Sequence, residues 1–472
     1  MNDIRVWARL FVFCLLSISL GLDIVRQKNR LVPKKISRPS LMVFLCGIMT
    51  CYAIIISTNK DLNMFYETSS FILLISLYIG LYYTLLVPSI RFLRKHFSAY
   101  TCAIFWLLPN YLYFTLLPAF TPKSFYIIKI NKLTLYIFFI LWFCGFIVSF
   151  AYSVFMHFST RKRLLKNIYD PPAEVQDLWK ECMRNIKSDY AEYHLAVCPE
   201  LETPLAIGVF KNATYVLLPP KEYTDEELGM IFRHELTHIL AEDPGTKMDM
   251  AFFTALNWFN PFMYKAIRKT SEDLELSCDE IVIKNYTDEQ KKKYAQLILS
   301  NSSETKGFTT CLSASADSLR YRLKEIVHPQ KKHLGIILVI NVFLIMVAGF
   351  SLCAFAVKNG TLQDHIKNYT HIENMEISGI ENIPHPYHQE KELLSSIGDI
   401  QMFSLYSTQD FEDPSIYVVL SNPDRDRIMV EMKNHRVHIS RIYDGSYERY
   451  TYYIDETIEE ISAKLLPYLQ NE

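Results

Sequence analysis

The sequence predicts a polytopic α-helical membrane protein that also carries two soluble α+β parts, one in the cytoplasm and one outside. Half of the 472 residues are hydrophobic and the mean hydropathy is +0.08, although 21% of the residues are charged. Apolar and charged segments must therefore alternate along the chain. Six apolar runs of about 18 to 24 residues are long enough to cross a bilayer as helices; they lie near 6–25, 39–57, 69–88, 98–120, 133–156 and 334–357.

The basic residues indicate the orientation, because connections rich in Lys and Arg stay in the cytoplasm. Such residues crowd the connections that follow the first, third and fifth runs, whereas 58–68 and 121–132 are short and carry fewer of them. No small-residue cleavage site follows the first run, so we expect an uncleaved helix. The expected order, from an external N-terminus, is five crossings in 1–157, a cytoplasmic block at 158–333, a sixth crossing at 334–357 and an extracytoplasmic domain at 358–472.

The cytoplasmic block begins with an expected helix over 172–189, whose Pro-Pro start is typical of a helix N-terminus. Short apolar runs of β type follow at 194–199, 204–210 and 214–219, separated by Pro, Gly and Asn. Runs of this length and punctuation predict a small sheet.

The next helix contains the stretch "TDEELGMIFRHELTHILAEDPG". Thr224 and Glu227 form a capping box at its start, and Pro244 prevents its continuation. A second helix is expected to begin at 260–261, where Asn-Pro supplies a cap and a first-turn proline. The apolar segment 247–268 is interrupted by Asp and Asn, so we expect it to be interfacial or partly inserted in the membrane.

Within that stretch, His234 and His238 are four residues apart on one helix, so both imidazoles can bind one tetrahedral Zn²⁺ ion. Glu235 lies about 100° further round the helix, where it can take a proton from water instead of binding the metal. This His-Glu-x-x-His pattern is typical of hydrolytic zinc sites with a glutamate as general base. The alternative is a surface helix with two solvated histidines.

A catalytic zinc site needs a third protein ligand. No His-x-x-Gly-x-x-His continuation follows, but the stretch "SEDLELSCDE" supplies acids on the next helix. Glu275 and Asp279 are four residues apart, so Glu275 could bind zinc while Asp279 orients a ligand histidine. The alternative is that this helix simply presents a solvated acidic face, comprising Glu272, Asp273, Glu275, Asp279 and Glu280.

The segments "LLPPKEYTDEELGMIFRHELTHI", "WFNPFMYKAI" and "EDLELSCDE" together resemble the BlaR/MecR family of membrane-embedded zinc metallopeptidases. The resemblance is specific over about 204–282, and the family's layout matches the rest of the chain in outline. It implies a gluzincin-like peptidase domain with one Zn²⁺ per chain and Glu275 as the third ligand. It also implies that Asp279 and Asp243 assist the ligands.

The C-terminal domain departs from the β-lactam-sensing members of that family. Residues 358–472 are too few for a penicillin-binding domain and contain neither Ser-x-x-Lys nor Lys-Thr-Gly. We therefore do not expect β-lactam acylation to be the signal. Strand-like runs and a helical end predict a small, acidic α+β domain; they lie at 415–420, 427–432, 450–454 and 455–470.

The resemblance implies a multi-pass protein of a bacterial cell membrane that turns an external event into cytoplasmic proteolysis. The expected partners are the lipid bilayer, an unidentified extracellular ligand and a cytoplasmic protein substrate, for which a transcriptional repressor is the family's pattern. Self-cleavage is expected within Ser300–Arg322, a polar stretch able to unfold into an extended strand. A housekeeping quality-control protease and a non-enzymatic receptor with a vestigial zinc site are the alternatives.

Several classes of site are not expected. The basic residues lie at membrane boundaries, where topology already explains them, so direct nucleic-acid binding is not indicated. None of the ten cysteines falls in 358–472, and the cytoplasmic block contains no Cys-x-x-Cys pair. A disulfide framework and a cysteine zinc site are therefore excluded. The sequence does not determine the oligomeric state, for which a homodimer is a candidate.

Overall fold

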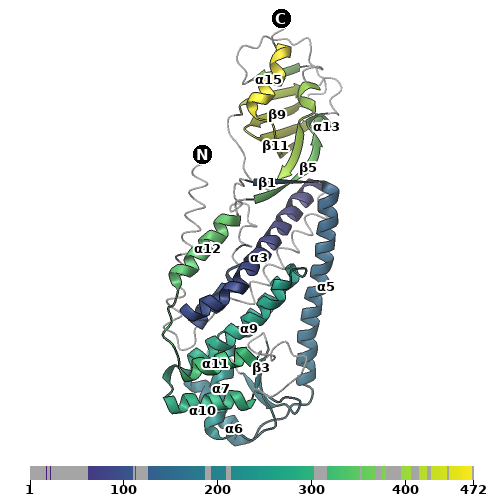
Figure 1. The fold of residues 1–472 in the computed structure, drawn as a ribbon. Helices are drawn as coiled ribbons and strands as arrows, with labels where there is room; N and C mark the ends of the chain where they lie inside the picture. The colour runs from purple at the N-terminus through teal and green to yellow at the C-terminus, as the bar shows by residue number, and fades with distance from the viewer. Residues whose placement is uncertain are drawn as a thin grey trace. The chain divides into compact units, whose positions relative to one another are not determined.

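The computed structural model describes a chain that divides into two compact units. The described residues are 18, 22, 62–109, 112, 126–186, 193–208, 214–301, 316–350, 353–366, 374–378, 395–405, 414–421, 427–443 and 446–469. One unit, here called the helical unit, comprises 1–51, 76–113 and 142–347. The other, the sheet unit, comprises 52–75, 114–141 and 348–472. Figure 1 shows the elements of both with their labels.

Long apolar helices correspond to two of the expected crossings. Helix α3 (Leu62–His96) contains the run at 69–88, and helix α5 (Lys132–Leu164) contains the run at 133–156. Within the described part of the chain, these two helices are long and apolar enough to cross a membrane. The runs at 6–25 and 39–57 fall outside the described residues, except for Ile18 and Leu22. The number of crossings and their orientation therefore stay predictions.

The other two apolar runs do not form helices over their whole length. Helix α4 spans only Ala99–Phe105 of the run expected at 98–120, and a turn follows it. Pro109 disfavours helix at the residues before it, which explains an early end. Helix α12 (Ile336–Phe350) is shorter than the run at 334–357, because strand β5 begins at Cys353. Apolar composition alone could not separate the helix from this buried strand.

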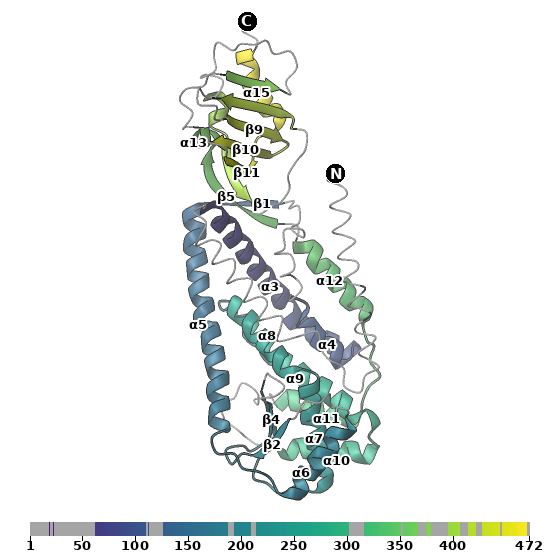
Figure 2. The ribbon, with the colours of Figure 1, turned by 180° about the vertical axis from the view of Figure 1, so that it is seen from behind.

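The peptidase-like part of the helical unit contains a small sheet and six helices among its described residues (Figure 2). Strands β2 (His194–Val197), β3 (Leu205–Ile207) and β4 (Tyr215–Leu218) lie in the order β2-β4-β3, which confirms the sheet expected from the sequence. The helices are α6 (Ala173–Asn185), α7 (Asp225–Leu240), α8 (Asp243–Leu256), α9 (Pro261–Val282), α10 (Asp288–Asn301) and α11 (Ala316–Val327). A 3₁₀ turn, η4 (Ile283–Asn285), follows α9.

The helix starts agree with the local signals in the sequence. Thr224 and Glu227 form the expected capping box, with the Thr224 side chain accepting from the backbone of Glu227. The Asn260 side chain accepts from the Phe262 backbone at the start of α9. Between α7 and α8, Glu242 adopts a left-handed conformation with φ 61°, so the chain turns sharply there. Local capping interactions alone therefore define the residues at which helices α7 and α9 begin.

The junction between α8 and α9 packs closely on the two long apolar helices. The Asn260 side chain donates to the Gly80 carbonyl of α3 at 3.2 Å, and the Trp142 indole of α5 donates to the Leu256 carbonyl at 2.8 Å. Gly145 lies directly against the Trp258 ring. The segment 247–268 thus contacts both candidate membrane helices, and its insertion in a bilayer stays a prediction.

The sheet unit contains an eight-stranded sheet, counted over its described residues, in the order β1-β5-β7-β11-β10-β9-β8-β6. The expected strands appear as β8 (Ile416–Ser421), β9 (Arg427–Lys433) and β11 (Ser446–Ile454), and the expected C-terminal helix as α15 (Ile458–Leu469). The unexpected elements are β1 (Tyr126–Ile130), β5 (Cys353–Thr361), β6 (Asn374–Ser378), β7 (Gln401–Leu405), β10 (Arg436–Tyr443) and the short helix α13 (Leu362–Ile366).

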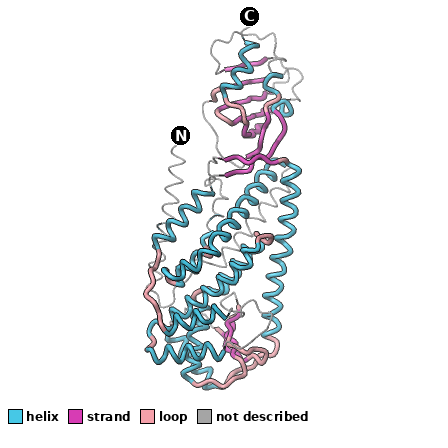
Figure 3. Tube along the Cα trace, in the orientation of Figure 1, coloured by secondary structure: helices cyan, strands magenta, loops and turns pink. Residues whose placement is uncertain are grey.

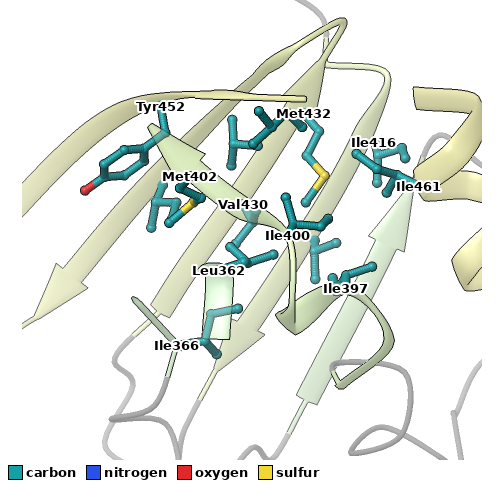
Figure 4. Packing of buried hydrophobic residues seen from close by; sticks show 14 of the residues in the cluster. Leu362, Ile366, Ile397, Ile400, Met402, Ile416, Val430, Met432, Tyr452 and Ile461 are labelled. Atoms are coloured by element: carbon teal, nitrogen blue, oxygen red, sulfur yellow. The ribbon is translucent and has the colours of Figure 1, made fainter. Parts of the chain in front are cut away.

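One face of this sheet carries a hydrophobic core, which Figure 4 shows from close by. Ile400, Met402 and Met432 are fully buried there and pack with Leu362 of α13 and Ile461 of α15. A core of this kind confirms an α+β unit at the C-terminal end. In Figure 3 the strands of this unit appear in magenta, with the short helices in cyan.

Strand β1 joins this sheet from a distant part of the sequence. It pairs in parallel with β5, with Tyr126 opposite Cys353 and Ile130 opposite Val357. Open sheet edges are not tolerated inside the hydrocarbon of a bilayer, so one sheet lies on one side of a membrane. The sheet thus joins 126–130 to the C-terminal part of the chain, and the side of a membrane on which it lies stays a prediction.

Candidate metal centre

Five helices bring polar side chains to one place in the helical unit. Helix α7 packs against α9, α8 and α10, and α11 packs against α9 and α10 (Figure 2). Helix α7 supplies His234, Glu235 and His238, while α9 supplies Glu275, Cys278 and Asp279. Asp243, Tyr294 and Arg322 come from α8, α10 and α11. The centre therefore depends on the packing of helices that are far apart in the sequence.

Three acceptor groups converge at the middle of the centre. The Nε2 atoms of His234 and His238 lie 3.1 Å apart. The Glu275 carboxylate places Oε1 at 3.5 Å from the Nε2 of His238 and Oε2 at 3.6 Å from the Nε2 of His234. Donor atoms bound to tetrahedral zinc through bonds of about 2.0–2.1 Å lie about 3.3 Å apart. The spacing of these atoms therefore fits a single zinc ion.

The outer nitrogen of each histidine has its own acceptor. The Nδ1 of His238 lies 2.7 Å from Oδ2 of Asp243. The Nδ1 of His234 lies 2.7 Å from the Tyr294 hydroxyl, which donates its own proton to Oδ1 of Asp279 at 2.9 Å. In the neutral rings, both Nδ1 atoms must then carry the proton, which leaves a lone pair on each Nε2 for a metal ion.

In this arrangement a tyrosine lies between Asp279 and the histidine that Asp279 was expected to orient. Its carboxylate lies 3.7 Å from the Nδ1 of His234, too far for a direct hydrogen bond. Tyr294 stands between them and relays the contact. This relay could not be predicted from the sequence, because Tyr294 lies on α10, fifteen residues after Asp279.

The electrostatics of the centre favour a positive charge. Burial lowers the pKa of His234, but the Cys278 side chain and the Glu275 carboxylate outweigh it and raise that pKa to about 10. Burial raises the pKa of Glu275, yet His238 and Arg322 hold it well below its usual range. A metal ion bound here would take the place of the protons that these anionic groups favour on the rings. The residues present therefore fit a metal ion.

Cys278 offers a second set of donors. His234, His238 and Cys278 can each place one ligand atom within 4.8 Å of the others. The Cys278 sulfur, however, lies 3.3 Å from the Nδ1 of His234, the nitrogen that faces away from His238. An imidazole binds one ion through one nitrogen, so an ion between the two Nε2 atoms would meet Glu275. Glu275 completes the more compact donor set.

Glu235 follows His234 on α7 and is largely buried, with 7% of its surface exposed. As the neighbour of His234 on the same helix, it lies about 100° further round α7 than that histidine. A buried carboxylate next to a metal-type cluster is well placed for proton transfer.

The other acids of α9 are not a solvated face. Asp273 is fully buried and accepts from the Arg94 guanidinium at 2.6 Å and from the Trp106 indole at 2.7 Å. Glu272 also contacts Arg94, at 2.9 Å, and Glu280 accepts from the Ala99 backbone at 3.1 Å. These residues join α9 to α3 and α4. They hold the helix that carries Glu275 and lie outside the cluster.

Arg322 is the third contributor that the sequence reading missed, after Tyr294 and Cys278. Its guanidinium contacts Asp279 and Glu275 at 2.8 and 3.2 Å. The residue lies in the basic stretch "RYRLKEIVHPQKKH", which membrane topology seemed to explain. The signal that could have identified Arg322 was a helical pattern in this stretch with one arginine on the inward-facing side.

Comparison with known proteins places this centre inside a matched region. Residues 117–326 match the family model described as BlaR1 peptidase M56. The chain is 24% identical over 188 residues to the regulatory protein BlaR1 of Bacillus licheniformis, which covers 39% of this chain and 31% of the relative. It is 25% identical over 118 residues to the methicillin resistance mecR1 proteins of Staphylococcus aureus and Staphylococcus epidermidis, which covers 24% of this chain and 20% of each relative. The chain thus spans about a third or less of the length of these curated relatives.

Proposed function

This chain belongs to the BlaR/MecR family of peptidases, and on that premise we propose that it is a membrane-bound zinc endopeptidase that turns an extracytoplasmic signal into cytoplasmic proteolysis. One observation carries the proposal. Two histidine nitrogens and one carboxylate, all groups that can ligate zinc, face one another within 3.6 Å. This grouping is costly without a cation and useful with one.

His234, His238 and Glu275 would hold the ion. Zinc bound there would supply Lewis-acid chemistry, which polarises a peptide carbonyl and makes water a better nucleophile. Glu235 then acts as the general base, taking the proton of the attacking water and passing it to the leaving amine. Asp243 and the Tyr294–Asp279 pair keep the histidine rings oriented, with the ring proton on the outer nitrogen.

The small sheet supports a peptide substrate in extended form. Strand β3 is at one end of the order β2-β4-β3 within the described residues, and it contacts α7, the helix of the two histidines. An extended segment can add to such an edge through main-chain hydrogen bonds. We infer a cytoplasmic protein substrate, with a transcriptional repressor as the first candidate because the matched relatives are a regulatory protein and resistance proteins.

Self-cleavage stays part of the proposal, with a narrower window. Of the expected stretch Ser300–Arg322, residues 300–301 end α10 and 316–322 lie in α11. A peptidase binds extended chain, so a helical segment would have to unwind first. The cut is therefore expected at 302–315, which lies outside the described residues.

The first test separates the base from the ligands. Glu235→Gln should keep the bound zinc and abolish proteolysis, because the amide cannot accept the proton. His238→Ala and Glu275→Ala should lose both, since each removes a ligand. Zinc content by mass spectrometry and fragment mapping of the full-length protein in detergent measure the two properties.

Glu174→Gln is the matched control, because Glu174 is exposed on α6 and lies outside the cluster. It should behave as wild type in both assays. An active Glu235→Gln protein, or a wild-type protein that binds no zinc, would overturn the proposed function.

A further inference from the structure

Arg322 makes three close contacts with the carboxylates of α9. Its Nε lies 2.8 Å from Oδ2 of Asp279 and its Nη2 lies 3.1 Å from Oδ1, so the guanidinium grips both oxygens of one carboxylate. Its Nη1 lies 3.2 Å from Oε2 of Glu275. The side chain is 12% exposed, so these contacts are shielded from water. Shielded, two-pronged arginine–carboxylate contacts are strong and geometrically specific.

The contact with Glu275 fixes how that carboxylate is turned. Its Oε2 faces both Arg322 and the Nε2 of His234, while its Oε1 faces the Nε2 of His238. A rotation of the carboxylate about its last bond would break the Arg322 contact. Without that contact, a glutamate side chain has several rotamers and pays conformational entropy to bind a metal.

Arg322 also balances the charge of the centre. Glu275, Asp279 and Asp243 each contribute one negative charge at or next to the two histidines. A zinc ion and the Arg322 guanidinium would place positive charge beside these carboxylates. Removing one partner of a buried ion pair leaves an uncompensated charge, which is strongly unfavourable. Without Arg322, the pair of carboxylates on α9 would lose the guanidinium that contacts both of them, at 2.8 and 3.2 Å.

The helix that carries Arg322 is fixed on the centre by its own contacts. Ile326 of α11 is fully buried in the hydrophobic core shared with α7 and α9. The Tyr321 hydroxyl donates to the Arg94 carbonyl of α3 at 3.3 Å, and Glu325 pairs with Lys332 at 2.7 Å. These contacts determine the position from which Arg322 reaches Glu275 and Asp279.

We propose that Arg322 is a positioning residue that holds Glu275 and Asp279 in the orientation required for zinc binding, so that the metal centre is complete only when α11 is docked against α9. The inference rests on the proposed function, because it concerns the same zinc ion. It adds a fifth helix to the centre and a residue 40 or more positions beyond the motif of α9. It also makes zinc affinity depend on the docking of α11.

The test measures metal binding apart from proteolysis. Arg322→Gln removes the positive charge and one of the two hydrogen bonds to Asp279. It should weaken zinc binding by about ten- to a hundred-fold, the range found when residues that hydrogen-bond to metal ligands are removed. Zinc affinity of the full-length protein in detergent can be measured by competition with a chelator. Co²⁺ substitution gives a second readout, because the visible spectrum of bound Co²⁺ reports ligand geometry and should change in the variant.

Two further variants make the result specific. Arg322→Lys keeps the positive charge but cannot form the bidentate contact with Asp279. Its zinc affinity should therefore lie between those of wild type and Arg322→Gln. Arg320→Gln, on the exposed side of the same helix, should match wild type in affinity and spectrum. Circular dichroism confirms folding, and if Arg322→Gln fails to fold, Arg322→Lys alone decides.

The outcomes separate the two claims. A wild-type protein without zinc affinity would defeat the proposed function. A wild-type protein that binds zinc, with both Arg322 variants binding equally well and showing the same Co²⁺ spectrum, would overturn the role of Arg322 and leave the proposed function standing.

Discussion

Tyr294 reaches the metal centre from α10 and contacts both His234 and Asp279 through one hydroxyl group. The hydroxyl accepts from one and donates to the other, so it sets which nitrogen of His234 keeps the proton. Burial and the Asp279 carboxylate raise the pKa of Tyr294 well above its usual value, so the hydroxyl stays protonated. A neutral tyrosine thus passes the effect of a carboxylate to a ligand without adding charge.

Tyr294→Phe removes this link while keeping the ring. The Nδ1–H of His234 would lose a buried acceptor, which costs about 1–3 kcal/mol. Zinc affinity should fall by about ten-fold in the chelator competition assay. Tyr286→Phe is the control, because it removes a hydroxyl from a neighbouring ring, whose centroid lies 6.0 Å from that of Tyr294. Equal zinc affinity in Tyr294→Phe and wild type would show that His234 needs no such partner.

At the same scale, the ionisation of Glu280 makes the stability of the fold depend on pH. Burial raises the pKa of Glu280 to about 7, and the negative charge of Glu325 also raises it. Hydrogen bonds from the Ala99 backbone and the positive charge of Lys332 act in the opposite direction. Glu280 lines a cavity of about 330 Å³ with Glu325 and Lys332. A carboxyl group whose pKa is higher in the folded state stabilises the fold fully below its unfolded pKa. That contribution is lost as the pH rises through about 7.

Glu280→Gln should remove this dependence, because the amide cannot ionise but can still accept from Ala99. Wild type should lose stability relative to Glu280→Gln between about pH 4.5 and about pH 7. Thermal unfolding of the detergent-solubilised proteins across that range measures the difference. Parallel curves for the two proteins would mean that Glu280 ionises in the fold as it does in water.

At the scale of elements, local signals in the sequence predicted helices such as α7 and α9. The pairing of strands that are distant in the sequence could not be predicted. The capping box at Thr224 and the Asn-Pro start at Asn260 are contained within a few residues, so α7 and α9 could be placed from the sequence. Strand β1 could not, because its partner β5 lies more than 200 residues later. Arg322 was equally hidden, since only the packing of α11 on α9 brings it to Glu275.

The junction of α8 and α9 allows a test of packing between elements. A Cβ at Gly145 of α5 would overlap the Trp258 ring, whereas a Cβ at Gly229 of α7 would meet nothing within 4 Å. Gly145→Ala should therefore destabilise the protein by about 1–3 kcal/mol, because the indole must shift. Gly229→Ala should stabilise it by about 0.5–1 kcal/mol, as alanine does inside a helix.

Chemical or thermal unfolding in detergent can compare the two alanine variants directly. Because the expected changes in stability have opposite signs, a general effect of alanine on helices cannot explain both. If both variants were stabilised, the close contact of Trp258 with α5 would be wrong.

At the scale of the whole molecule, the eight-stranded sheet adjoins the helices α5 and α12 at two places in the sequence. Strand β1 runs directly into α5, with Lys132 starting the helix two residues after Ile130. Strand β5 begins three residues after the end of α12. The other neighbour of β5 is β7, with which it pairs antiparallel through Ala356 and Leu405. The sheet is therefore built from two separate parts of the chain.

This has a consequence for how such proteins can be recombined, by evolution or by engineering. A C-terminal domain is usually treated as a cassette that can be exchanged at one junction. Here an exchange at residue 358 would divide β5 and leave β1 without its native neighbour. A working chimera would have to transplant 126–130 together with 353–472, so that an exchange of this domain needs a second transplanted segment.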